Sequence, residues 1–208
     1  MDERKKALAI QYMREIAGDF PVTDKFPMVL PDRDRMEVTL LGTYGAVVKG
    51  RGGKFRVDDN TVAKVEKVMK WMYESPKRGL LLCGTLGNGK TTMLRSLVHI
   101  LGRAASYYEA QTIFNYYKQN QTPLHIPRNT VLLIDDLGAE PPVCNDYGEK
   151  NYPLTELLME RYKTNATTVI ATNLTMTQIR DTYGERLQDR MFELCAMLRY
   201  DAPSYRKL

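Results

Sequence analysis

The chain has 208 residues, of which 43% are hydrophobic and 26% are charged, and its formal net charge is +5. This length accommodates one well-buried domain with an appendage but excludes two full domains, and the composition is ordinary for a soluble globular protein. The three cysteines are far apart and form no CxxC pair, so a zinc site or a disulfide framework is not expected. The positive charge permits a polyanionic partner without requiring one.

The N-terminal sequence lacks the uninterrupted apolar run that signal peptides contain. No apolar stretch elsewhere approaches the ~18 residues that a membrane-spanning helix needs. These features predict a cytoplasmic protein that does not interact with a membrane.

The first quarter of the chain predicts a small extension that precedes the main domain. Residues 2–17 have the apolar spacing of an amphipathic helix, and residues 21–37 contain three prolines that favour an extended linker. In residues 38–57, short apolar runs alternate with glycines, which predicts one or two strands joined by turns. We therefore expect residues 1–55 to form an N-terminal α/β extension that can contact a partner.

From residue 58 onward, short apolar strands alternate with amphipathic helices. This alternation indicates a parallel sheet covered by helices on both faces. The predicted fold is therefore an α/β domain over residues 56–208 with a five-stranded parallel sheet flanked by helices. The expected strands are residues 79–84, 104–110, 130–135, 167–172 and 192–200, and the expected helices are residues 58–75, 90–101, 111–120, 153–163, 175–183 and 185–191.

The first chemical motif is a glycine-rich octet, GTLGNGKT, between a predicted strand and a predicted helix. It fits the phosphate-binding P-loop, in which glycines let backbone N–H groups approach phosphate oxygens and the helix N-terminus faces the anion. In this pattern Lys90 contacts the β- and γ-phosphates, and the Thr91 hydroxyl binds Mg²⁺. The residues expected to bind the nucleotide are Gly84, Thr85, Leu86, Gly87, Asn88, Gly89, Lys90, Thr91 and Thr92.

The second motif is the stretch VLLIDDLG, an apolar strand that ends in two acidic residues. A carboxylate at the end of a buried strand beside a P-loop can bind Mg²⁺ through its water shell, and we assign this role to Asp135. Asp136 would then face the γ-phosphate and polarise the attacking water. Without the P-loop, the same pattern would indicate only a strand that enters a turn.

The third motif is VIATN, in which a strand ends in Thr172 and Asn173. Ligands of open α/β sheets bind at the carboxyl ends of the strands, so the Asn173 amide can orient a water molecule against the γ-phosphate. The alternative is that Asn173 only caps or turns the chain.

The stretch GERLQDRM contains Arg186 and Arg190, which are four residues apart in a predicted helix. This spacing places both guanidinium groups on one face of the helix. The spacing alone favours surface ion pairs, Arg186 with Asp189 and Arg190 with Glu193.

In this order, the P-loop, the Asp-Asp strand, the Thr-Asn strand and the arginine-bearing helix resemble an AAA+ ATPase. The stretches LLIDDLGAE, LLMERYKTNATTVIATNL, GERLQDRM and SYRKL are similar to the DnaC/DnaI/IstB family of helicase loaders and transposition helper ATPases. The resemblance covers residues 60–208. It implies an AAA+ base domain, ATP and Mg²⁺ as cofactors, and ATP hydrolysis that is slow without a partner.

The resemblance also implies roles for individual residues. Lys90 and Thr91 match Walker A, Asp135 and Asp136 match Walker B, Asn173 matches sensor I, Arg190 matches an arginine finger that acts in trans, and Arg206 matches a sensor II-like arginine. A finger that acts in trans implies self-association in the ATP-bound state. The implied partners are a replicative helicase or a transposase, together with single-stranded DNA.

The chain departs from the family pattern in three ways. Walker B ends in Asp-Asp, whereas many AAA+ proteins have Asp-Glu there. The sequence ends two residues after Arg206, so we expect no helical lid domain. The segment between the second strand and Walker B is short, which weakens the expectation of DNA binding. Two other readings are a P-loop small-molecule kinase, for which no arginine-rich insert is visible, and a binding switch with negligible hydrolysis.

Overall fold

The computed structural model describes residues 25–146 and 148–200. The helices are α2 (Arg33–Gly50), α3 (Asp59–Tyr73), α4 (Lys90–Leu101), the 3-10 turn η2 (Gly102–Ala104), α5 (Ala110–Asn120), α6 (Pro153–Lys163), α7 (Met176–Tyr183) and α8 (Glu185–Leu194). The strands are β1 (Gly79–Gly84), β2 (Ala105–Glu109), β3 (Val131–Leu137), β4 (Cys144–Asp146), β5 (Glu149–Asn151), β6 (Thr168–Thr172) and β7 (Cys195–Tyr200).

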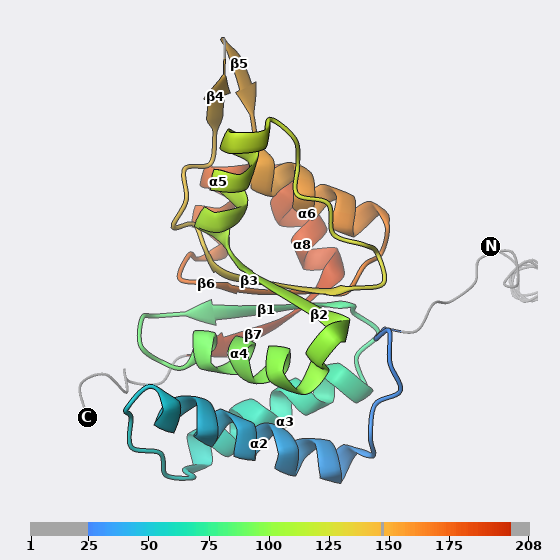
Figure 1. Cartoon of the computed structure of the whole chain (residues 1–208), viewed down its shortest axis with the longest axis vertical. Coiled ribbons are helices and arrows are strands. Elements are labelled where there is room, and N and C mark those ends of the chain that lie inside the picture. Colours follow the sequence, from blue (N-terminus) through green and yellow to red (C-terminus); the bar gives the residue numbers. More distant parts are fainter. Residues whose placement is uncertain (1–24, 147, 201–208) are drawn as a thin grey trace, which may run out of the picture.

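Five strands form one sheet in the order β2-β3-β6-β1-β7, and every neighbouring pair is parallel. Figure 1 shows the sheet between two helical layers, with α2, α3 and α4 below it and α5, α6 and α8 above it. The predicted α/β fold with a five-stranded parallel sheet is therefore confirmed. All five strands run in one direction, so their carboxyl ends share one edge, which we call the carboxyl edge, and their amino ends share the opposite amino edge.

Alternation along the strands divides the core into two parts. Leu80 and Leu82 of β1 pack into the cluster with α2, α3 and α4, whereas Leu81 packs into the cluster with α5, α6 and α8. β6 repeats this pattern, because Val169 and Ala171 join the first cluster and Ile170 joins the second. Successive side chains of a strand point to opposite faces, so a strand buried on both faces must be apolar throughout.

The prediction of strands within residues 38–57 is wrong, because most of this segment lies in helix α2. The helix begins after Asp32, whose side chain accepts a hydrogen bond from the Arg35 N–H. Met36, Leu40 and Tyr44 recur every four residues and are buried against the rest of the protein. The predicted linker over residues 21–37 is correspondingly too long at its C-terminal end.

Two smaller features also differ from the prediction. Helix α8 extends to Leu194, so the last strand begins at Cys195 rather than at residue 192. Strands β4 and β5 form an antiparallel hairpin that the sequence did not predict, and the hairpin projects beyond α5 and α6 (Figure 1). The predicted helix at residues 2–17 lies outside the described residues.

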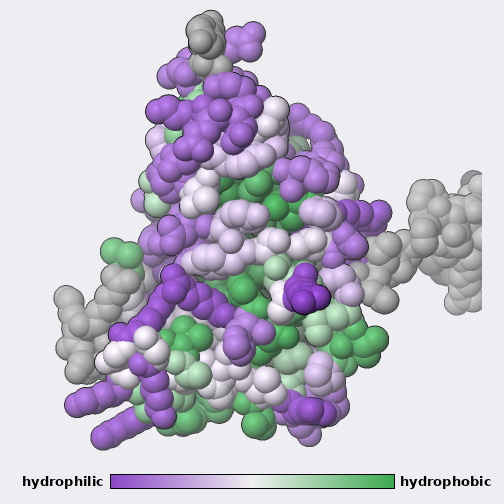
Figure 2. Space-filling view, in the orientation of Figure 1, coloured by the Kyte–Doolittle hydropathy of each residue, from purple (hydrophilic) through white to green (hydrophobic). Residues whose placement is uncertain are grey.

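The surface is more polar at one end of the molecule than at the other. In the view of Figure 2, hydrophilic residues dominate around α5 and the hairpin, and hydrophobic side chains reach the surface mainly around α2 and α4. Within residues 25–146 and 148–200, none of the helices combines the length and apolarity that crossing a membrane requires.

Candidate active site

The carboxyl edge of the sheet brings the three predicted motifs together. Thr172 at the end of β6 pairs with Cys83 of β1 on one side and with Leu137 of β3 on the other. The P-loop, the Asp-Asp pair and the Thr-Asn pair therefore lie at the carboxyl ends of three adjacent strands, at the same height in the sheet.

The P-loop connects β1 to α4 with three glycines at positive φ, and at two of them the surroundings also leave no room for a side chain. Gly84 has a φ of +142° and Gly89 a φ of +95°, values that side chains disfavour. A Cβ atom at Gly84 would collide with the Tyr200 carbonyl, and one at Gly89 would collide with the Tyr44 hydroxyl. Because glycine has no Cβ atom, the loop can pass closely between β7 and α2 at these two positions.

Lys90 begins helix α4 and folds back over the P-loop. Its ammonium group donates hydrogen bonds to the carbonyls of Gly84 at 2.7 Å and Thr85 at 2.8 Å, and the side chain is buried. Asn88 is fully buried and donates to the Tyr200 carbonyl. The Lys90 ammonium is therefore held by carbonyls of the P-loop itself, at the start of helix α4.

The Thr91 hydroxyl lies 3.2 Å from Oδ1 of Asp135, although 44 residues separate the two in the sequence. The Asp135 carboxylate is almost completely buried, and its Oδ2 accepts a 2.8 Å hydrogen bond from the Tyr107 hydroxyl. Burial and the contact with Asp135 raise the pKa of Tyr107, so this phenol remains a donor. A hydroxyl and a carboxylate this close form an oxygen donor set that fits Mg²⁺.

Asp136 occupies an irregularity in β3. The pairing with β6 shifts between Ile134 and Leu137, and Asp136 has a φ of +53°. Ile134 and Leu137 both face the α5–α8 cluster, which is impossible for residues three apart in a regular strand. The strand therefore contains a bulge, a device that redirects side chains beside functional sites. It leaves Asp135 buried and Asp136 exposed.

Asn173 is exposed immediately after β6. The preceding Thr172 hydroxyl donates a 2.6 Å hydrogen bond to the Leu137 carbonyl and accepts one from the Leu174 N–H. This pair of bonds ties the end of β6 to the end of β3. Asn173 consequently lies next to the Asp-Asp motif, as its predicted role requires.

Helix α3 contributes a second buried cation beneath the P-loop, which the sequence did not predict. The Lys64 ammonium donates a 2.9 Å hydrogen bond to the Asn88 carbonyl and lies 4.8 Å from the centre of the Tyr200 ring. Burial is the main cause that lowers the pKa of Lys64 to about 8; Asp58 opposes the shift, and nearby Lys90 contributes to it. In the sequence Lys64 belongs to a run of helical charges, so no signal distinguishes it.

A buried pair fixes the loop that follows β3. Oε2 of Glu140 accepts a 3.0 Å hydrogen bond from the Gly138 N–H, and Oε1 accepts one from the Tyr183 hydroxyl of α7. Burial raises the pKa of Glu140. The pair connects the loop after β3 to α7, the helix that precedes GERLQDRM, and nothing in the sequence pattern indicated it.

Arg190 makes the ion pair that its spacing predicted. Its guanidinium donates to both carboxylate oxygens of Glu193 at 2.7 and 2.8 Å and lies 4.9 Å from the centre of the Tyr162 ring. The Tyr162 hydroxyl also donates to Glu193, which lowers the pKa of that carboxyl together with Arg190. Arg186 is exposed, and its predicted pairing with Asp189 is not among the ion pairs of the described residues. Arg206 lies outside those residues.

No protein-family model matches the chain, and no curated protein matches it. Among solved structures, one of DnaI is 23% identical with a TM-score of 0.52, over 74% of this chain and 88% of that chain. A structure of the DnaC helicase loader is 19% identical with a TM-score of 0.52, over 71% of this chain and 94% of that chain. At these identities the likeness shows a common fold, which agrees with the predicted α/β fold with a P-loop and a five-stranded parallel sheet.

Proposed function

We propose that the protein binds ATP with Mg²⁺ at the carboxyl edge of the sheet and hydrolyses it. The observation that carries this proposal is the 3.2 Å approach of the Thr91 hydroxyl to the Asp135 carboxylate, beside a P-loop whose lysine is already directed at the loop. A P-loop threonine and a strand-terminal aspartate are the two groups that hold Mg²⁺ in P-loop ATPases.

On ATP binding, phosphate oxygens would replace the Gly84 and Thr85 carbonyls as acceptors of the Lys90 ammonium. The backbone N–H groups from Gly84 to Thr92 would surround the phosphates. Thr91 and Asp135 would hold Mg²⁺, which supplies positive charge to the β- and γ-phosphate oxygens when it is bound. Tyr107 occupies one oxygen of Asp135, so the other oxygen is directed at Thr91.

Asp136 and Asn173 are the groups that we assign to the attacking water. Both are exposed at the ends of adjacent strands, and the bulge at Asp136 separates it from the buried Asp135. The carboxylate would accept a proton from water, and the amide would orient that water in line with the γ-phosphate. Because aspartate is shorter than glutamate, we expect slow hydrolysis by the isolated protein.

We assign Arg190 as a finger for a neighbouring subunit. Its guanidinium is partly exposed and held by Glu193 and Tyr162, and it would exchange the Glu193 carboxylate for a neighbouring subunit's γ-phosphate. Such fingers raise phosphoryl-transfer rates by about 10³ or more. Arg206 would act as the sensor II-like arginine. ATP binding would then promote self-association.

The partner that we favour is a replicative helicase, with single-stranded DNA as a further ligand. The fold shared with the DnaC helicase loader supports this choice. The alternative is a transposase, as in IstB-like helper ATPases. In either case residues 1–55 would contact the partner and residues 56–208 would form the ATPase domain of a cytoplasmic protein.

A subunit-mixing experiment tests the central assignments. Lys90→Ala should abolish ATP binding, because it removes the ammonium group that we assign to the β- and γ-phosphates. Arg190→Ala should bind ATP normally but lose at least about tenfold in turnover. When the two variants are mixed, Lys90→Ala subunits should supply intact fingers to Arg190→Ala subunits, and activity should partly return. Phosphate release is measured with and without single-stranded DNA and a replicative helicase.

Arg186→Ala is the matched control, because it removes a guanidinium from the same helix and should hydrolyse ATP at the wild-type rate. Wild-type turnover by Arg190→Ala in every assembly would exclude the finger. Failure of the wild-type chain to bind ATP with Mg²⁺ would exclude the whole proposal.

A further inference from the structure

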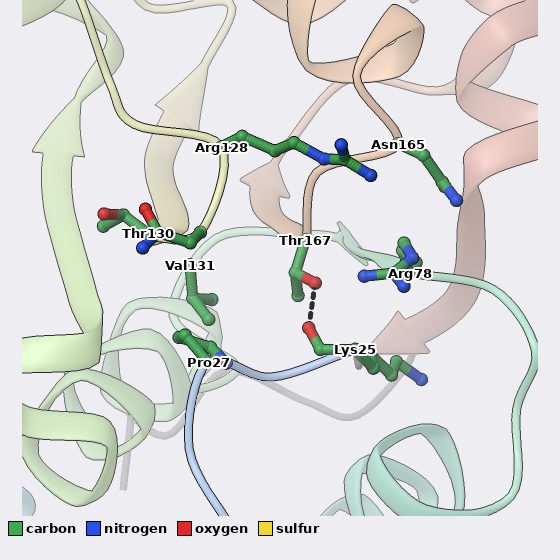
Figure 3. A pocket seen from close by; sticks show the side chains of 9 residues that line it. Lys25, Pro27, Arg78, Arg128, Thr130, Val131, Asn165 and Thr167 are labelled. Carbon is green, nitrogen blue, oxygen red and sulfur yellow. Dashed lines mark hydrogen bonds between the residues drawn. The ribbon is translucent and has the colours of Figure 1, made fainter. Parts of the chain in front are cut away.

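We propose that the amino edge of the sheet holds a second anion site, which takes a phosphate group. A cavity of about 240 Å³ opens there, at the edge opposite the P-loop (Figure 3). Since β1 has six residues, the two sites are roughly 20 Å apart. The cavity is lined by Lys25, Pro27, Arg78, Arg128, Asn129, Thr130, Val131, Asn165 and Thr167.

The lining is strongly cationic. Three of these nine residues are basic and none is acidic. Figure 3 shows the Arg128 side chain reaching toward Asn165, with Arg78 on the same side of the opening. Two guanidinium groups and an amide therefore come from three separate segments of the chain to one opening.

A fourth cation lies behind the wall of the cavity. Arg161 of α6 is 2% exposed, and its guanidinium donates to the carbonyls of Pro127 at 3.0 Å, Thr130 at 2.6 Å and Thr167 at 2.7 Å. Its Nε–H donates to the Thr168 hydroxyl at 3.1 Å, so its hydrogen bonds within the described residues include no carboxylate. Burial lowers the pKa of Arg161 to about 10. Carbonyl dipoles solvate the guanidinium without neutralising its charge, and an anion in the cavity would offset that charge.

Lys25 adds charge to the cavity without being directed into it. Its ammonium donates to the carbonyls of Trp71 and of Ser75, at 3.1 Å for Ser75, and lies 4.6 Å from the centre of the Trp71 ring. The Lys25 carbonyl in turn accepts a hydrogen bond from Thr167 (Figure 3). Burial, and to a smaller extent the charge of Arg78, lower the pKa of Lys25 to about 8.

The chemistry of these groups selects a phosphate. The planar guanidinium matches two phosphate oxygens at once, and asparagine amides can donate to the others. The lining contains no aromatic ring on which a nucleobase would stack, so the phosphate itself is the recognised group. The source is either the backbone of a single-stranded nucleic acid or a free phosphorylated compound.

The test uses the full chain carrying Lys90→Ala, so that the P-loop does not contribute. Pyrophosphate binding is measured by titration calorimetry, and binding of a labelled oligo-dT strand is measured by fluorescence anisotropy. Arg128→Glu should weaken binding roughly ten- to a hundredfold, because it replaces a charge-assisted donor with a repelling carboxylate. Arg128→Gln should cause a smaller loss. Lys150→Glu, an equal charge reversal in the exposed β4–β5 hairpin, should leave binding unchanged.

The two ligands distinguish the sources. Binding of oligo-dT that pyrophosphate displaces identifies a nucleic-acid backbone, and binding of pyrophosphate alone identifies a free phosphorylated compound. No binding of either at millimolar concentration, or equal binding by Arg128→Glu, would overturn the proposal. With Lys90 intact, Arg128→Glu should hydrolyse ATP at the wild-type rate, so this result is independent of the proposed ATPase function.

Discussion

The two anion sites that we propose at the edges of the sheet are built by different means. At the carboxyl edge, the P-loop is one continuous turn, and its glycines, Lys90 and Thr91 are adjacent in the sequence. At the amino edge, the cations Lys25, Arg78 and Arg128 come from segments far apart in the sequence and meet only in the folded chain. A site built from backbone conformation leaves a pattern in the sequence, whereas a site built from dispersed side chains leaves none.

The edges also hold their buried cations differently. Lys90 can exchange the carbonyls of its own loop for phosphate oxygens. Arg161 instead joins the starts of β3 and β6 through the carbonyls of Thr130 and Thr167, and the Thr167 carbonyl also accepts a hydrogen bond from the Leu132 N–H. A buried cation is thus proposed as a ligand-binding element at one edge and as a structural element at the other, and this contrast can be tested from both sides.

The largest effect is expected at the amino edge. Arg161→Met should lower the free energy of unfolding by about 3 kcal/mol, because it removes the four hydrogen bonds that the buried guanidinium donates to three carbonyls and the Thr168 hydroxyl. Urea unfolding followed by circular dichroism measures this change. Arg180→Met removes an exposed arginine and should change stability by less than about 0.5 kcal/mol. A loss of similar size in both variants would contradict the structural role of Arg161.

An intermediate effect is expected at the carboxyl edge. Tyr107→Phe removes the donor that holds Oδ2 of Asp135, and should raise the Mg²⁺ concentration for half-maximal ATP hydrolysis about tenfold. The phenylalanine ring fills the same space, so stability should change little. Tyr108→Phe is the control, because Tyr108 packs against the opposite face of the sheet. Unchanged Mg²⁺ dependence in Tyr107→Phe would show that Asp135 needs no such support.

The smallest expected effect is proton uptake on ATP binding, tested at one lysine from each edge. Lys64 and Lys25 both have pKa values lowered to about 8. ATP brings negative charge close to Lys64, which favours the protonated amine and raises its pKa. At pH 8 the protein should therefore take up a fraction of a proton when ATP binds. Calorimetry in buffers of different ionisation enthalpy measures this uptake. Lys64→Met should lose part of this proton uptake, and Lys25→Met should retain all of it. Equal proton uptake by the two variants would show that ATP does not change the pKa of Lys64.

Sequence reasoning succeeded where local pattern and three-dimensional structure agree. Strands β1, β3 and β6 are short apolar runs that can only be buried, and their predicted bounds lie within two residues of the observed ones. Helix α2 was missed because Gly42, Gly45 and Gly50 resemble strand and turn residues. Gly45 is instead needed for close packing, since a Cβ there would collide with the Phe55 ring.

The features that the sequence did not predict depend on how neighbouring strands are aligned. Tyr107 of β2 pairs with Leu133 of β3, two residues before Asp135, so both polar groups lie on one face of the sheet. In the sequence Tyr107 is one aromatic residue in an apolar strand, and packing explains it equally well. Similarly, the β4–β5 hairpin consists of short polar strands without apolar alternation. Such features become visible only when the neighbouring strand is known.

Trp71 makes the amino edge observable without any modification. It is the single tryptophan of the chain, and its ring lies against the Lys25 ammonium and the Phe26 ring, with its N–H bonded to the Lys77 carbonyl. Indole emission is sensitive to nearby charge, so all tryptophan fluorescence of the protein reports on this one edge. The molecule therefore carries its own optical probe, about one strand length away from the proposed nucleotide site.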